Sequence, residues 1–70
     1  MRKNIANVIA AFKARRAHRE ATCHTDGATI WSYAMPIAWR NPDDGATIIT
    51  TERSSVTTNG QINACKKELL

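Results

Sequence analysis

The chain has 70 residues, a mass of 7.8 kDa and a net charge of +4. A chain this short buries only roughly 60% of its extended surface, so it forms one small domain with a thin core. Such a core excludes a cofactor-dependent enzyme, a doubly wound sheet and a barrel. The sequence has no apolar run of about eighteen residues to span a membrane, and its basic N-terminus lacks the apolar segment of a signal peptide. We therefore expect a cytoplasmic α+β domain.

The positive charge is concentrated near the N-terminus. Residues 1–20 hold six cations and one acid, a net charge of +5, whereas the remaining fifty residues carry a net charge of −1. A positive pole of this kind attracts an anionic surface such as nucleic acid or an acidic protein face. The alternative is a solvated helix whose arginines only keep the protein soluble.

Residues 3–21 are predicted to form a helix. Four apolar residues fall at i, i+3, i+4 and i+7 without an intervening Gly or Pro, which is the pattern of a buried helix face. Continuing this face leads to cations, so the second half of the helix either projects past the sheet or covers apolar surface with its arginine stems. The apolar residues are Ile5, Val8, Ile9 and Phe12, and the cations are Arg16 and Arg19, with Arg15 beside them.

A stripe of small residues is expected on the opposite face of this helix. Alanine is the best helix former, so the stripe is either filler or a close-approach surface for a second helix. In the second case the chain docks a partner helix or forms a homodimer. The members of the stripe are Ala10, Ala14, Ala17 and Ala21.

A β-hairpin is predicted in the middle of the chain. Residues 22–27 indicate a loop that ends in an Asp-Gly turn, and residues 28–40 have strand character. Pro36 cannot donate to a ladder, so it lies at an edge, at a bulge or between two short strands. The Asn-Pro-Asp-Asp-Gly sequence at 41–45 is a strong turn signal, and the returning strand is predicted over 46–53.

A second helix is predicted over residues 59–69. Thr58 and Gln61 fit a capping box, in which the Thr58 hydroxyl accepts the Gln61 amide proton and the Gln61 side chain reaches back. The apolar stripe of this helix is Ile62, Cys65 and Leu69, and its last turns carry Lys66 and Lys67, where the helix dipole favours cations.

These elements give the order α-β-β-(β)-α. We expect a small antiparallel sheet of two or three strands with an N-terminal and a C-terminal helix, both packed on one face of the sheet. The residues expected in the core are Ile9, Phe12, Ile37, Ile49 and Ile62.

Two short strings of the sequence resemble a known pattern. They are Ser32-Tyr33-Ala34-Met35-Pro36-Ile37-Ala38 and Ser55-Val56-Thr57-Thr58. Together they resemble a family of short bacteriophage-encoded proteins with the pattern Ser-Tyr-x-Thr-x-Ile-Ala, a turn, and then Tyr-Ser-x-Thr-Thr-x-x-His. That family has no assigned activity, so the resemblance, which covers about residues 28–62, implies a phage or another mobile element as the source. The chain departs from the pattern at Met35, Ser54 and Gln61, and the missing His weakens a catalytic or metal role for the motif.

The matching hydroxyl residues have a structural explanation and a functional one. In the first, Thr57 and Thr58 end a strand and cap a helix, while Ser32 and Ser55 face each other across the strands. In the second, the hydroxyl-rich helix N-terminus binds an anion such as phosphate. The residues of that anion site are Arg53, Thr57, Thr58 and Gly60.

The sequence indicates no catalytic, cofactor or metal site. The soft metal ligands lack a Cys-x-x-Cys pair, so buried side chains and free thiols are expected in place of a zinc site or a disulfide. Adjacent carboxylates in the turn bond the local backbone, and no His lies near a credible nucleophile. The residues considered are His18, Cys23, His24 and Cys65 as ligands, and Asp43 and Asp44 in the turn.

The element order also resembles that of the double-stranded RNA-binding domain. The resemblance is one of topology only, because Lys66 and Lys67 come too late in the last helix to match the lysines of that domain. Trp31, Tyr33 and Trp39 would stack bases if they lay on an open sheet face, but a core this small is expected to need most of them inside.

The leading functional hypothesis is a phage-encoded, non-enzymatic binding protein in the host cytoplasm. It modulates or inhibits a host protein or nucleoprotein complex through the basic helix, in host takeover or against host defence. The runner-up is a nucleic-acid-binding protein that contacts phosphates through the same helix, and a third class is a self-associating accessory protein. The partner-binding residues expected are Arg15, Arg16 and Arg19, together with Lys13.

Overall fold

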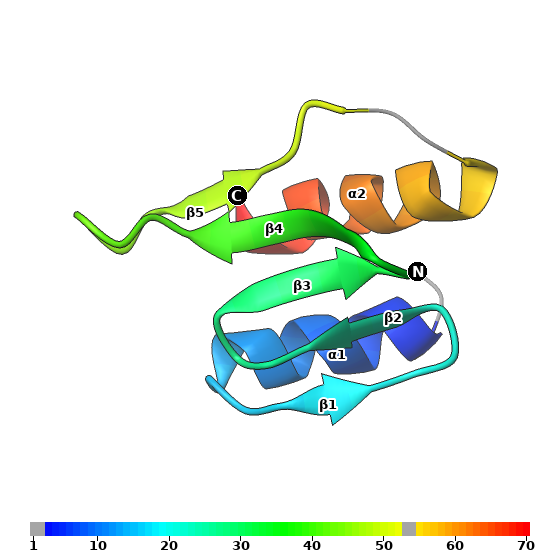
Figure 1. Cartoon of the computed structure of the whole chain (residues 1–70), viewed down its shortest axis with the longest axis horizontal. Helices are drawn as coiled ribbons and strands as arrows, with labels where there is room; N and C mark the ends of the chain where they lie inside the picture. Colours follow the sequence, from blue (N-terminus) through cyan, green and yellow to red (C-terminus); the bar gives the residue numbers. More distant parts are fainter. Residues whose placement is uncertain (1–2, 53–54) are drawn as a thin grey trace.

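The structure is a five-stranded antiparallel sheet with both helices on one face (Figure 1). It is a computed structural model that describes residues 3–52 and 55–70. The predicted α+β class is confirmed, but the sheet has five strands where two or three were expected, because two further short strands, at residues 18–19 and 23–25, precede the predicted hairpin. The elements are α1 (Lys3–Lys13), β1 (His18–Arg19), β2 (Cys23–Thr25), β3 (Thr29–Ser32), β4 (Met35–Arg40), β5 (Thr47–Ile49) and α2 (Val56–Leu69).

The core lies between the sheet and the two helices. Helix α1 packs on β1, β2 and β3, helix α2 packs on β4 and β5, and the helices also contact each other. The predicted apolar face of α1 is confirmed, and four of the five expected core residues are buried. The fifth, Ile49, is partly buried against the same cluster. The buried cluster is Ile5, Val8, Ile9, Phe12, Cys23, Ile30, Ile37, Ala38, Ile62 and Cys65.

Helix α1 ends at Lys13, so the prediction of a helix to residue 21 is wrong. Arg15 has a φ of 58°, a left-handed conformation that ends the helix. The amide of Arg16 donates to the carbonyl of Ala11 at 2.9 Å and that of Arg15 to Phe12 at 3.1 Å, which is the hydrogen-bond pattern of a Schellman motif. The helix thus stops where its large apolar residues stop, because a continuation made of alanines and polar residues has little apolar surface to bury.

The segment after α1 is a hairpin of two short strands, β1 and β2. His18 pairs with Thr25 and Arg19 with His24, so the loop predicted over 22–27 begins too early. Glu20 lies in the connection, where its carboxylate contacts His18 at 2.6 Å and accepts from Asn7 of α1 at 3.2 Å. These hydrogen bonds lower the pKa of Glu20 and tie the hairpin to the helix.

The predicted turns around the central strands are confirmed. Asp26 accepts the amides of Ala28 and Thr29, which fixes the Asp-Gly turn between β2 and β3. The turn at 41–45 joins β4 to β5, although β5 is shorter than the strand predicted over 46–53. Pro36 lies inside β4 opposite Trp31, next to a register irregularity in β3.

Helix α2 begins one turn earlier than predicted. Its N-cap is Ser55, whose hydroxyl accepts the amide of Thr58 at 3.2 Å, so the capping box of Thr58 and Gln61 is wrong. Thr58 instead lies inside the molecule and contacts Ser32 of β3. The Gln61 side chain donates to Thr22 at 2.9 Å and links α2 to the β1–β2 hairpin.

Candidate functional site

One face of the sheet carries no helix, and we call it the uncovered face. Side chains alternate between the two faces of a strand, so Thr29 and Trp31 beside buried Ile30, and Trp39 beside buried Ala38, point away from the helices. The strand register places these outward residues in two adjoining rows. One row is Arg19, His24, Trp31 and Pro36, and the next is Thr29, Trp39 and Ile48.

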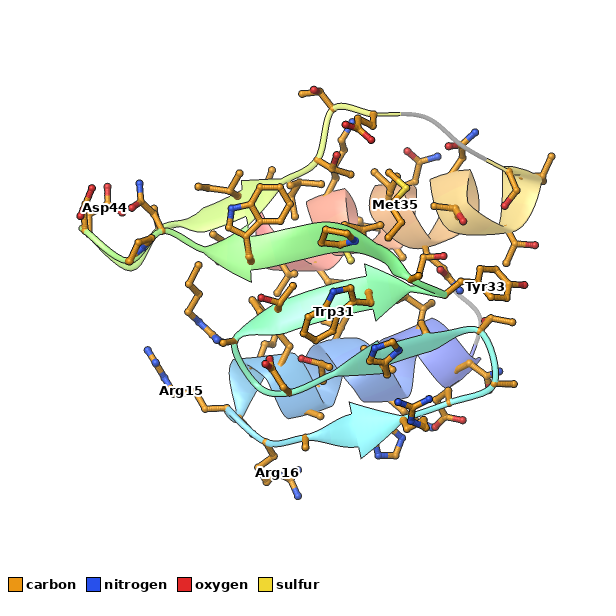
Figure 2. The ribbon with its side chains drawn as sticks, in the orientation of Figure 1. Arg15, Arg16, Trp31, Tyr33, Met35 and Asp44 are labelled. Atoms are coloured by element: carbon orange, nitrogen blue, oxygen red, sulfur yellow. The ribbon has the colours of Figure 1, made fainter. Side chains whose placement is uncertain are left out.

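Aromatic rings occupy the middle of the uncovered face. The rings of His24 and Trp31 are stacked, with centroids 5.0 Å apart and planes 15° from parallel. Trp39 lies in the next row, and both indoles are partly exposed. The chain has two tryptophans, so the expectation that most aromatics are needed in the core is wrong for both. Figure 2 shows Trp31 over the middle of the sheet.

Of the sequence-predicted arginines, Arg19 lies in the first row of this face, and none of the three is on a helix. Arg15 and Arg16 follow the end of α1 and Arg19 lies in edge strand β1, and all three are exposed. Lys13, the last residue of α1, is also exposed. Within the described residues the ion pair found is His18 with Glu20, so none of these cations is neutralised by a neighbouring carboxylate. In Figure 2 the side chains of Arg15 and Arg16 point outward.

The alanine stripe predicted for self-association does not form one face. Ala10 lies in α1, Ala14 in the turn after it, Ala17 before β1, and Ala21 in the connection to β2. All four are exposed, but helix α1 ends before three of them. The structure therefore offers no small-residue helix surface for docking at these positions.

Tyr33 is an exposed aromatic outside the uncovered face. It lies in the two-residue turn between β3 and β4, its side chain is 56% exposed, and its φ is 54°. A bulky residue with this left-handed backbone is uncommon. Figure 2 shows its ring pointing off the end of the sheet, so it does not continue the rows of Trp31 and Trp39.

Of the anion site predicted at the start of α2, the structure describes Thr57, Thr58 and Gly60. Thr58 is 3% exposed and its hydroxyl contacts Ser32, so it faces the core and not a ligand. Gly60 lies beyond the first turn of α2, and Thr57 is half-buried. Arg53 lies outside the described residues.

The two cysteines are buried and free. Burial raises the pKa of Cys65 to about 12 and raises the pKa of Cys23 above its usual value. Thiols in such surroundings are not nucleophiles at neutral pH. Among the residues that the structure describes, no three His, Cys, Asp or Glu side chains gather as metal ligands, and no helix is both long and apolar enough to cross a membrane.

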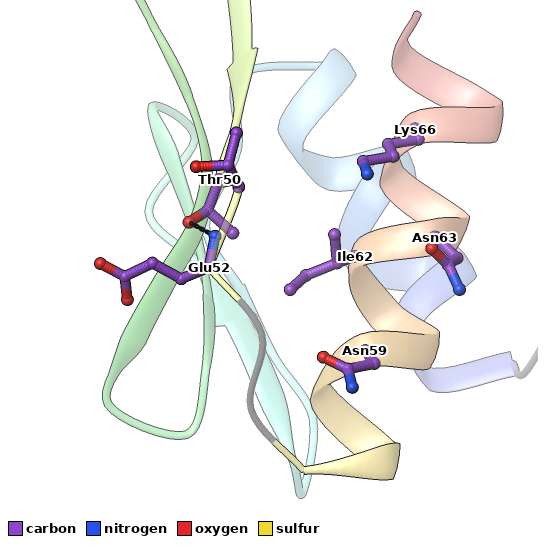
Figure 3. A pocket seen from close by; sticks show the side chains of 7 residues that line it. Thr50, Glu52, Asn59, Ile62, Asn63 and Lys66 are labelled. Carbon is purple, nitrogen blue, oxygen red and sulfur yellow. Dashed lines mark hydrogen bonds between the residues drawn. The ribbon is translucent and has the colours of Figure 1, made fainter.

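A small groove separates α2 from the segment after β5 (Figure 3). Ile62 lies between the two segments, with Thr50 and Glu52 on one side and Lys66 on the other. The Glu52 amide donates to the Thr50 hydroxyl at 3.1 Å. The groove has a volume of about 120 Å³, below the roughly 300 Å³ at which small-molecule sites begin. It is therefore too small for an organic ligand.

The chain was also compared with known proteins. No family model, no curated protein and no solved structure matches it. The resemblance to short phage proteins therefore stays a prediction, and the function has to be inferred from the residues of the uncovered face.

Proposed function

We propose that this chain is a non-enzymatic protein that binds single-stranded nucleic acid on its uncovered face. The observation that carries the proposal is the position of Trp31 and Trp39. Both are partly exposed on the one sheet face that no helix covers, beside cations that have no carboxylate partner within the described residues.

The two kinds of residue match the two parts of a nucleotide. Bases stack on aromatic rings for about 1–3 kcal/mol per base, whatever the base, because every base has a π-face. Phosphates are neutralised by arginine and lysine, which makes binding depend on salt. A duplex hides its base faces in its own stack, so aromatic rings on a flat sheet favour single strands.

The rows of the uncovered face suit an extended strand. Trp39 of β4 pairs with Thr29 of β3, and Trp31 lies two residues after Thr29 in β3. The two rows are therefore about 6.7 Å apart along the strands. The arginine of the first row, Arg19, lies across His24 from Trp31. A nucleic-acid strand whose bases stack on both indoles therefore meets a cation at the edge of the sheet.

The sequence-based hypothesis of a host protein partner becomes an outcome of the same test. An acidic protein surface would engage Arg15, Arg16 and Arg19 by charge, and it would leave the stacking faces of Trp31 and Trp39 unused. Substitution of Trp31 or Trp39 therefore distinguishes a nucleic-acid partner from an acidic protein partner. A phage source is part of the proposal only through the sequence resemblance.

The proposal is tested by fluorescence anisotropy with a labelled oligothymidine strand. We expect Trp31→Ala to weaken binding by roughly 5- to 150-fold, the equivalent of about 1–3 kcal/mol for one stacked base. Tyr33→Ala is the matched control, because it removes an exposed aromatic outside the uncovered face, and we expect less than about a two-fold change. Circular dichroism and urea unfolding confirm that both variants are folded.

The salt dependence supplies a second readout. Each phosphate contact on a single strand contributes a slope of about −0.7 in log K against log salt. Arg19→Ala should therefore make the slope less negative by about that amount. Equal affinity of the wild type and Trp31→Ala for the strand would contradict the proposal. Binding of the duplex as tightly as the single strand would contradict it as well.

A further inference from the structure

A cleft opens at the end of the sheet where α1 stops. It has a volume of about 460 Å³ and lies between the β2–β3 turn and the β4–β5 turn, with Arg15 and Arg40 in its wall. In Figure 2 the Arg15 side chain extends outward at this end of the molecule. Two arginines from distant parts of the sequence therefore line one open cleft.

The guanidinium of Arg40 is held in place by the fold. It donates to the backbone carbonyls of Gly27 and Phe12 and stacks over the Phe12 ring, 3.9 Å from its centroid. A guanidinium has five N–H donors, so these contacts orient the group and leave donors for a ligand. Within the described residues no carboxylate pairs with Arg40.

The backbone of Arg15 is held against Gly27. A Cβ added at Gly27 would lie 2.8 Å from the carbonyl carbon of Arg15, so the two backbones touch. Arg15 has a φ of 58°, in a region that favours glycine. The contact with Gly27 fixes the backbone of Arg15 at the wall of the cleft.

The charges of the cleft are not balanced within the chain. Burial and the nearby charge of Arg15 both lower the pKa of Arg40, so the two cations repel each other. Asp26 also lines the cleft, but its Oδ1 accepts the amides of Ala28 and Thr29 at 2.9 and 3.0 Å and it pairs with neither arginine. An anion placed between the guanidiniums would relieve the repulsion, and the guanidinium fork matches the oxygens of phosphate.

We infer that this cleft binds a phosphate group between Arg15 and Arg40. The inference rests on the proposed function for the source of the phosphate. Trp39 faces the uncovered side and Arg40, the next residue of β4, faces the helices, so a nucleic-acid strand stacked on Trp39 would reach the cleft around the end of β4. A free phosphate ion offers the same chemistry, and the experiment separates the two sources.

The test is a nuclear magnetic resonance titration of the whole chain with inorganic phosphate. We expect saturable shifts of the Gly27 amide and the Arg40 side-chain N–H signals. Arg15→Ala should weaken phosphate binding by about 10-fold or more, as is usual for a lost charged hydrogen bond. Arg16→Ala is the matched control, because it removes the adjacent exposed cation that does not line the cleft, and it should change affinity less than about two-fold.

A second variant guards against loss of fold. Arg15→Gly relieves the left-handed strain, so it should raise the unfolding midpoint while weakening phosphate binding as Arg15→Ala does. Equal loss in Arg15→Ala and Arg16→Ala, or no shift at Gly27 and Arg40, would overturn the phosphate site. Such a result leaves the stacking test of Trp31 intact, so the two proposals fail separately.

The source of the phosphate is decided by adding oligothymidine to the phosphate-loaded chain. Displacement of phosphate from the cleft, seen at Gly27 and lost in Arg15→Ala, supports the backbone as the occupant. Phosphate that stays bound while the strand occupies Trp31 and Trp39 would overturn that assignment.

Discussion

The hydroxyl oxygens of Ser32 and Thr58 lie 2.8 Å apart inside the molecule and join β3 to α2. The Ser55 hydroxyl donates to the same Thr58 oxygen at 3.1 Å. These residues belong to the two sequence strings that resemble the phage pattern, so the strings meet in space although 26 residues separate Ser32 from Thr58. The hydroxyl residues of the motif thus hold β3 and α2 together, and we call this pair of contacts the clamp. The expected form of this structural role is wrong, because Thr57 and Thr58 lie inside α2 and neither end a strand nor cap the helix, and because Ser32 meets Thr58 where Ser55 was expected.

The clamp predicts unequal costs for its two members. Ser32→Ala leaves the Thr58 hydroxyl with Ser55 as a partner, so we expect a loss of about 1 kcal/mol. Thr58→Val keeps the side-chain shape but leaves the Ser32 hydroxyl buried without a partner among the described residues, and we expect a loss of about 1–3 kcal/mol. Urea unfolding of both variants and of the double variant measures this. A double variant that costs the full sum of the single losses would show that the residues are not coupled.

We predict that substitution of Gly27 destabilises the fold more than substitution of any other glycine. Its φ is 98°, and a Cβ there would meet the Arg15 backbone at 2.8 Å, so Gly27→Ala should cost about 2 kcal/mol or more. Gly60→Ala is the control, because nothing lies within 4 Å of its Cβ position in α2. That substitution should stabilise the chain by about 0.5–1 kcal/mol. Thermal unfolding that ranks the two variants in the opposite order would contradict the contact between Gly27 and Arg15.

Asp26 is expected to make the stability depend on acid pH. The amides of Ala28 and Thr29 lower its pKa from the ordinary 3.8, so the charged carboxylate is more stable in the folded chain than in the unfolded chain. The contribution is complete above about pH 4 and is lost as the pH falls through the lowered pKa. The free energy of unfolding of Asp26→Asn should therefore lie furthest below that of the wild type at neutral pH, and the difference should shrink as the pH falls. Urea melts over this range check it, and a constant difference between the two proteins would refute it.

The sequence predicts the parts of the fold that repeating patterns describe. The spacing of Ile5 and Phe12 in α1 and the turn chemistry at Asp26 are local signals, and the structure confirms both. The end of α1 is not a local signal, because Ala14 and Arg15 are good helix formers. It depends on the lack of apolar surface to bury beyond Phe12 and on the contact with Gly27, which is distant in sequence.

The sequence predicts the cations of the candidate site but not the positions of its tryptophans. The cations at Arg15, Arg16 and Arg19 follow from charge counting, although their predicted helical placement is wrong. The outward positions of Trp31 and Trp39 depend on which strand residues face the helices, and the irregular register beside Pro36 breaks the simple alternation. Ser32 after Trp31 is polar but buried, so the sequence lacks the alternation of apolar and polar residues that would mark an outward indole.

The most direct measurement of single-strand binding on the uncovered face is intrinsic tryptophan fluorescence. The chain has two tryptophans, and Trp31 and Trp39 both lie on this face, so the signal reports on the face alone. We expect an unlabelled oligothymidine strand to quench the emission saturably, and we expect added salt to shift the titration to higher strand concentration. Emission that stays unchanged while anisotropy shows the strand to be bound would place the nucleic acid elsewhere and would contradict the account.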